Sequence, residues 1–203
     1  MVPTQPSRML PDRIRAFVAL RLSPEVERSV ADLIESVRSF DDLHGAIRWV
    51  RRANLHVTLR FLGDRVEASI LEQLDRALSQ IGSATASFTV GVRGTGAFPN
   101  LTRPRVVWIG LESPEMIALA RRVERAAIDA GLTPELRAYS PHLTIGRVRD
   151  VAGWSAVRPA IIAADQSDFG RCVVKSMVLY RSNLTPDSAT YEELARYPFN
   201  GAN

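Results

Sequence analysis

Two histidines that recur in the same short pattern are the residues of this chain best suited to chemistry. His56 and Thr58 stand in a His-Val-Thr-Leu segment, and His142 and Thr144 stand in a His-Leu-Thr-Ile segment. Successive side chains of a β-strand point to opposite faces, so each segment would present one imidazole and one hydroxyl on one face and two apolar groups on the other. The chain contains 3 histidines, and two of them lie in this repeated setting.

A matched pair of imidazoles can divide the work of an acid and a base, because imidazole titrates near neutral pH. A threonine two residues further along can donate a hydrogen bond to the same bound group. Two imidazoles and two hydroxyls that converge suit a tetrahedral oxyanion, with phosphate as the leading candidate. One histidine would take a proton from an attacking water, and the other would protonate the leaving oxygen on the opposite side.

Other kinds of site fit the pattern less well. Zinc normally needs three or four protein ligands, and this pair supplies two, so a third would have to come from a distant carboxylate. A serine–histidine–acid triad uses one histidine rather than a matched pair. The glycines of residues 94–100 are followed by neither Lys-Ser/Thr nor a helix, so they are read as a loop and not as a phosphate-binding loop. We therefore predict no metal and no cofactor.

Two arginines follow the histidine segments closely. On a regular strand, Arg60 shares the face of the first imidazole, whereas Phe61 falls on the core side. On the same geometry Arg147 points away from the second imidazole, but a bulge at Gly146 would redirect it. On spacing alone, a surface position is an equally good interpretation of Arg147.

The elements that must carry these residues alternate along the chain. Ser23 followed by Pro24, and Ser113 followed by Pro114, each predict the start of a helix. Helices are expected from residue 24, at 66–81, from 114 to about 130 and at 154–163. Strands are expected at 14–20, 47–50, 55–62 (ended by Gly-Asp at 63–64), 88–92, 105–110, at the second histidine segment, at 172–179 and at 189–197.

This order reads as strand, helix, histidine strand, helix and strand, followed by the same series again. It predicts two similar halves that face each other and bring both histidines to one cleft. The remaining histidine, His44, falls in a polar stretch and is predicted to lie in a solvated loop.

Composition limits the class of protein. The chain of 203 residues is 46% hydrophobic, which suits a single domain of residues 1–203 with two lobes. The formal net charge is +4, and Lys175 is the only lysine, so arginine supplies nearly all the positive charge. Arginine favours bidentate contact with phosphate, and the charge tilts the case toward an anionic substrate. The single cysteine, Cys172, is predicted to be a buried inert thiol. We expect a soluble, cytoplasmic monomer with a flexible segment at 1–12.

Taken with their neighbours, the two histidine segments resemble those of the 2H phosphoesterase superfamily, and most closely the RNA 2',3'-cyclic phosphodiesterases, also called 2'-5' RNA ligases. The resemblance covers roughly residues 13–199. Its strongest parts are residues 54–63 and 141–147. Supporting parts are residues 15–20, 48–50, 98–99, 103–108 and 182–186, together with Tyr191.

The resemblance implies an α+β fold of two pseudo-symmetric lobes, each an antiparallel sheet with helices packed outside it, and a central active-site cleft. It implies metal-independent opening of a terminal RNA 2',3'-cyclic phosphate to a 2'-phosphate. Carried over to this sequence, His56 is the acid and His142 the base. Thr58, Thr144 and Arg147 would hold the phosphate.

Two alternative functions remain at this point. One is a related enzyme that performs reversible 2'-5' RNA ligation or hydrolyses a small cyclic phosphate such as ADP-ribose cyclic phosphate. The other is a non-catalytic RNA-binding protein with a vestigial cleft, which the intact histidines and threonines argue against. In each case the expected partner is an RNA end or a nucleotide, and not a membrane.

Overall fold

The computed structural model describes residues 13–41, 45–185 and 189–201. The expectations of a flexible segment at 1–12 and of a solvated His44 lie outside these residues. The strands are β1 (Arg13–Leu20), β2 (Ile47–Trp49), β3 (Val57–Glu67), β4 (Phe88–Phe98), β5 (Val106–Glu112), β6 (His142–Val148), β7 (Asp168–Val174), β8 (Ser176–Leu184) and β9 (Ala189–Pro198). The helices are α1 (Pro24–Arg38), α2 (Ala68–Ser83), α3 (Pro114–Asp129) and α4 (Val151–Ala163), with a short 3-10 turn η1 (Arg52–Asn54).

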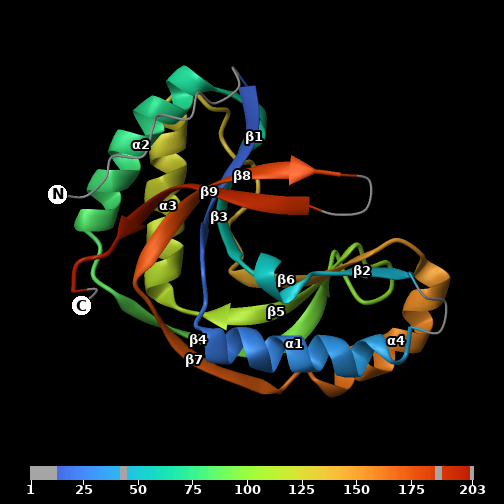
Figure 1. The fold of residues 1–203 in the computed structure, drawn as a ribbon. Coiled ribbons are helices and arrows are strands. Elements are labelled where there is room, and N and C mark those ends of the chain that lie inside the picture. Colours follow the sequence, from blue (N-terminus) through green and yellow to red (C-terminus); the bar gives the residue numbers. More distant parts are fainter. Residues whose placement is uncertain (1–12, 42–44, 186–188, 202–203) are drawn as a thin grey trace.

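The strands form two sheets, and their pairings are antiparallel throughout the described chain. The first sheet has four strands in the order β3-β1-β8-β9, and the second has five in the order β2-β6-β5-β4-β7. In Figure 1, α2 and α3 lie on the outer side of the four-stranded sheet, and α1 and α4 lie on the outer side of the five-stranded sheet. The predicted α+β fold, with antiparallel sheets and helices outside them, is confirmed.

The two lobes do not coincide with the two halves of the sequence. Strand β4 comes from the first half but pairs with β5 in the five-stranded sheet. Strand β8 comes from the second half but pairs with β1 in the four-stranded sheet. The prediction that the halves simply face each other was therefore incomplete: each half gives two strands to the sheet of the other, β2 and β4 in one direction and β8 and β9 in the other.

The two helix starts form as the sequence predicts. The Ser23 hydroxyl accepts a hydrogen bond from the Val26 backbone N–H at 3.4 Å, and the Ser113 hydroxyl accepts one from the Met116 backbone N–H at 3.3 Å. Such a cap satisfies an N–H group that has no partner within its helix, and is typically worth about 1 kcal/mol. Helix α3 ends at Asp129, and Gly131 follows with a φ of 95°, which suits glycine.

The largest differences from the predicted boundaries occur at three places. Strand β3 continues through residues 63–64, because Gly63 adopts a φ of 142° at a shift in the pairing register. Strand β4 continues through residues predicted to be a loop, because Gly94 (φ 70°) forms a bulge while its neighbours stay paired. The predicted strand at 172–179 is two strands, which divide at Lys175.

One contiguous apolar core joins the elements of both sheets. A smaller cluster lies on the opposite face of the four-stranded sheet and contains Phe17, Ala19, Val178 and Tyr180, with Phe61 and Tyr191 packed against it. This smaller cluster forms one wall of the candidate site.

Cys172 is buried, as predicted, and burial raises the pKa of its thiol.

Candidate active site

A bulge in β3 determines what surrounds the first histidine. On β1, Ala19 lies opposite Thr58 and Phe17 lies opposite Phe61, while Leu59 has no partner of its own. Residues directly opposite each other in a sheet share a face, so Phe61 lies on the face of Thr58. The prediction that Arg60 shares this face was wrong, because one unpaired residue reverses every later side chain.

A second bulge occurs at the matching place in β6. On β5, Trp108 lies opposite Thr144 and Val106 lies opposite Arg147, while Ile145 has no partner of its own. Because Trp108 and Val106 are two residues apart on one strand, Arg147 returns to the face of Thr144. A bulge that redirects Arg147 is present, but at Ile145 and not at Gly146, which pairs with Val107. Each bulge follows the threonine of its segment directly, and it brings an arginine to the site in one copy and a phenylalanine in the other.

The two imidazoles are held in the same way. His56 Nδ1 lies 2.7 Å from the Asn54 carbonyl oxygen, and His142 Nδ1 lies 2.8 Å from the Ser140 carbonyl oxygen. A carbonyl oxygen only accepts hydrogen bonds, so in both rings Nδ1 carries the proton. The other nitrogen, Nε2, is left to accept a proton or to donate one, as general acid–base chemistry requires.

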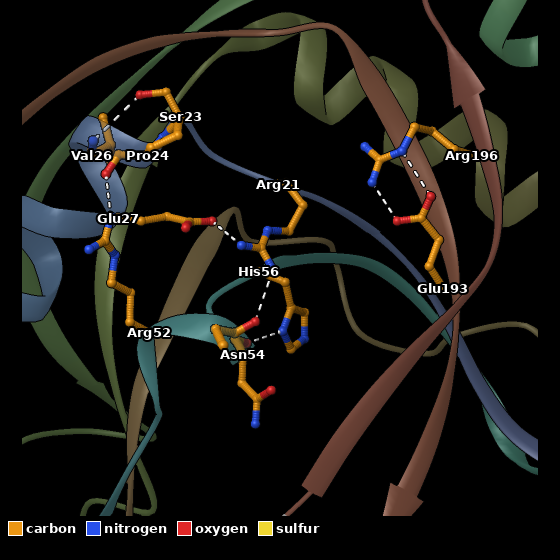
Figure 2. Close-up of polar contacts among 11 residues, drawn as sticks. Arg21, Ser23, Pro24, Val26, Glu27, Arg52, Asn54, His56, Glu193 and Arg196 are labelled. Carbon is orange, nitrogen blue, oxygen red and sulfur yellow. Dashed lines mark hydrogen bonds and ion pairs between the residues drawn. The ribbon is translucent and has the colours of Figure 1, made fainter.

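The turn before His56 is tied to distant parts of the chain, as Figure 2 shows. The Arg21 guanidinium donates to the Ala53 carbonyl oxygen at 3.0 Å and pairs with the Glu27 carboxylate at 2.6 Å. The Asn54 side-chain amide donates to the Ala189 carbonyl oxygen at 2.8 Å. Since the Asn54 carbonyl orients the imidazole, these contacts fix the ring through its backbone support.

Aromatic rings surround both histidines. The Phe17 ring centroid lies 4.8 Å from that of His56, and the Tyr191 ring meets His56 edge-on at 4.9 Å. The Phe98 ring meets His142 edge-on at 5.1 Å. These contacts restrict each ring further and remove water from around His56.

The electrostatic surroundings of His56 favour its neutral form. Burial lowers the pKa of His56 to about 4, and the charges of Arg21, Arg147 and His142 act in the same direction. The hydrogen bond to the Asn54 carbonyl opposes the shift. At pH 7 His56 is therefore a neutral imidazole, and its Nε2 has no hydrogen-bond partner within the described residues.

A groove runs between the lobes beside the histidines. Its volume is about 990 Å³, and its walls come from β1, β8 and β9 of one sheet, from β2 and β6 of the other, and from α1 and η1. Tyr191 lies in this wall, with Arg147, Arg15 and Arg48 near its phenol. Burial raises the pKa of Tyr191, and these three positive charges oppose the rise.

Of the predicted site residues, Thr58 shares the β3 face that adjoins His56, and His142, Thr144 and Arg147 share one face of β6. Sequence reasoning did not assign Phe17, Tyr191 or Arg15 to the site. Their signal was present in part: Arg15 and Phe17 are two residues apart on a predicted strand and therefore share a face.

Arg60 points away from the candidate site and binds groups on α3 and the loop after it. Its side chain is only 9% exposed; it forms an ion pair with Glu124 on α3 and donates to the carbonyl oxygens of Phe61 and Thr133. Glu124 in turn accepts from the Glu135 backbone N–H at 2.7 Å. The side chain that follows the first histidine segment thus anchors the loop that leads to the second.

No three or more His, Cys, Asp or Glu side chains converge as the ligands of a metal ion in residues 13–41, 45–185 and 189–201. Within the same residues, no helix has the length and apolar character needed to span a membrane.

Comparison with known proteins agrees with this geometry. The family model of the 2'-5' RNA ligase superfamily matches residues 23–186. The RNA 2',3'-cyclic phosphodiesterase of Methanothermobacter thermautotrophicus is 32% identical over 183 residues, which are 90% of this chain and 97% of that protein. The RNA 2',3'-cyclic phosphodiesterase of Methanocaldococcus jannaschii is 29% identical over 184 residues, which are 91% of this chain and 100% of that protein.

A solved structure has the same architecture. The crystal structure of E. coli LigT complexed with 3'-AMP superposes with a TM-score of 0.73 at 26% identity, covering 93% of this chain and 99% of that one. The family model, these relatives and this structure each span most of the chain, and the predicted family is confirmed. The chain belongs to the 2'-5' RNA ligase superfamily.

Proposed function

We propose that this protein hydrolyses the terminal 2',3'-cyclic phosphate of RNA to a 2'-phosphate without a metal ion, with His56 and His142 as its acid and base. The observation that carries the proposal is the matched pair of imidazoles, each with Nδ1 bonded to a backbone carbonyl and Nε2 free. The curated relatives at about 30% identity are RNA 2',3'-cyclic phosphodiesterases, and the LigT structure holds a 3'-nucleotide.

In this proposal Nε2 of His142 takes a proton from water as the water oxygen bonds to phosphorus. The bond from phosphorus to the 3'-oxygen breaks, and Nε2 of His56 gives its proton to that oxygen. The products are a 2'-phosphate and a 3'-hydroxyl. The hydroxyls of Thr58 and Thr144 and the guanidinium of Arg147 bind the remaining phosphate oxygens, where negative charge grows in the transition state.

The acid role of His56 requires that substrate binding change its protonation. In the free protein the pKa of His56 is about 4, so the imidazole lacks the proton that it must give. An anion within about 4–6 Å favours the charged form of a histidine and raises its pKa by about 1–3. The cyclic phosphate, which is itself anionic, would thus supply the charge that makes His56 an acid.

The test is hydrolysis of a cyclic-phosphate oligoribonucleotide in the presence of a chelator. We expect wild-type activity to persist, and His56→Ala and His142→Ala each to lose about 10²–10⁴-fold in kcat, because each proton transfer is typically worth that factor. Arg125→Ala, on the exposed side of α3, serves as the control for substitution itself. Full activity in either histidine variant would contradict the proposal.

The description of the family favours a second use of the same site, which is 2'-5' ligation. A 5'-hydroxyl of another RNA end would replace water as the nucleophile, and the same two proton transfers would form a 2'-5' phosphodiester. Incubating the enzyme with a cyclic-phosphate end and a 5'-hydroxyl end distinguishes a joined product from a hydrolysed one.

A further inference from the structure

Positive side chains outnumber negative ones in the lining of the groove beside the histidines. Six of the residues that line it are arginines, and two are acidic. The arginines are Arg15, Arg38, Arg48, Arg51, Arg52 and Arg147. Both acidic groups have partners in the groove wall: Glu35 pairs with Arg38 at 3.6 Å, and Asp41 accepts from the Ile47 backbone N–H at 3.4 Å.

Three of the six arginine side chains have neither an ion pair nor a hydrogen bond within the described residues, whereas Arg52 donates to the Pro24 carbonyl oxygen at 3.0 Å. Arg48, Arg51 and Arg147 form no ion pair with any carboxylate of the described chain. Arg15 is already paired with Asp64 and stacked over the Phe61 ring at 4.3 Å. The guanidinium group binds phosphate oxygens in bidentate fashion and stays charged at any working pH.

The groove adjoins the histidine site, but the histidines themselves do not line it. Neither histidine and neither threonine of the two segments lines its 990 Å³. Arg147 lines the groove and shares the face of Thr144, and Tyr191 lines it and touches the His56 ring. A cyclic phosphate held by the histidines therefore leaves this volume for the rest of its own molecule.

We propose that the groove binds single-stranded RNA upstream of the terminal nucleotide, with Arg48 and Arg51 contacting its phosphates. The inference rests on the proposed function and adds to it the groove residues that would hold the RNA strand. A mononucleotide has no such phosphates and would leave both arginines unused. Positive grooves that follow the backbone are the usual way in which proteins hold single strands.

The experiment measures kcat/KM for a ladder of oligoribonucleotides of one to four residues, all with the same 3'-terminal nucleotide and 2',3'-cyclic phosphate. We expect kcat/KM of the wild type to rise with length. In Arg48→Gln/Arg51→Gln, the loss for the tetramer should exceed the loss for the mononucleotide by about tenfold or more, since a hydrogen bond to a charged group is worth that much. Arg125→Gln, an exposed arginine outside the groove, should leave the length dependence unchanged.

Salt gives a second readout that a merely structural effect would not move. The slope of log K against log salt is about −0.7 for each phosphate contact with a single strand, so each lost contact should flatten the slope by about 0.7. Arg51 is exposed, so the single variant Arg51→Gln tests the same point if the double variant unfolds. Length-independent turnover, or equal losses for tetramer and mononucleotide, would overturn the groove assignment. If the wild type turned over no member of the ladder, the proposed function itself would fail.

Discussion

At the scale of single residues, the site holds its two histidines by the same hydrogen bond but surrounds them with different side chains. In both copies the imidazole is bonded through Nδ1 to the carbonyl two residues earlier. After the bulge, however, one copy presents Arg147 and the other presents Phe61. The repeated part suits proton transfer on both sides of a phosphate. The part that differs puts the bidentate cation on one side and an aromatic ring on the other.

The low pKa of His56 gives a prediction about anion binding. If a bound anion raises the pKa of His56 from about 4, the complex binds more protons than the free protein, so lowering the pH from 7 toward 5 should strengthen binding. Sulfate is a suitable probe because it is tetrahedral and does not titrate in this range. Calorimetry should show proton uptake on sulfate binding.

The control is His56→Asn, which should flatten the dependence of sulfate affinity on pH. Histidine signals followed by NMR would assign the uptake to one ring. Sulfate affinity that is independent of pH in the wild type would show that His56 does not change its protonation on binding.

At the scale of elements, the second bulge depends on how closely β2 packs against β6. Gly146 lies opposite Trp49, and a Cβ atom there would lie 2.8 Å from Ile47 Cγ2 and 3.1 Å from Trp49 Cε3. Its backbone has no special φ, so the close approach of β2 is what requires glycine. The bulge and this contact together set the direction of Arg147.

We therefore expect Gly146→Ala to displace β2 and to lower kcat/KM for a cyclic-phosphate substrate, with a loss of stability of about 1–3 kcal/mol from overpacking. Gly91→Ala is the matched control, because a Cβ atom there has no contact closer than 3.5 Å within the same sheet. Urea denaturation and steady-state kinetics of both variants check the prediction. Equal stability and equal kcat/KM of the two variants would mean that β2 makes room for the added methyl group without displacing Arg147.

The sequence predicted the elements better than their pairing. The histidine segments, the Ser-Pro helix starts and the burial of Cys172 follow from local pattern, and the structure has the helices and the buried thiol as predicted. The bulges at Leu59 and Ile145 do not follow from local pattern, because whether a residue is left unpaired depends on the partner strand and not on its sequence neighbours. For the same reason the opposite placement of Arg60 and Phe61, and the approach of Tyr191 to His56, could not be predicted from spacing alone.

At the scale of the whole molecule, the lobes share one core, so they should unfold together. The three tryptophans, Trp49, Trp108 and Trp154, lie in β2, β5 and α4, which all belong to the five-stranded lobe. Leu74 lies in α2, which packs on the four-stranded sheet, and its side chain is fully buried. Tryptophan fluorescence therefore reports one lobe while Leu74 stabilises the other.

We expect Leu74→Ala to lower the free energy of unfolding by about 2–5 kcal/mol, as measured by tryptophan fluorescence in urea. This is the usual result of emptying a buried leucine site. Far-UV circular dichroism should give the same midpoint. Leu136→Ala is the control, since Leu136 is 94% exposed and should change stability by less than about 0.5 kcal/mol. A fluorescence midpoint that does not move in Leu74→Ala would show that the lobes unfold independently.

The strand exchange between the halves has a consequence for how the chain could be divided. A cut between β4 and β5 would leave an N-terminal fragment that holds β2 and β4 of the C-terminal fragment's sheet, while β8 and β9 would be missing from its own. Neither fragment is a self-sufficient module. Each is instead the template for the other, so reassembly of the two pieces and recovery of the histidine site would be a single event.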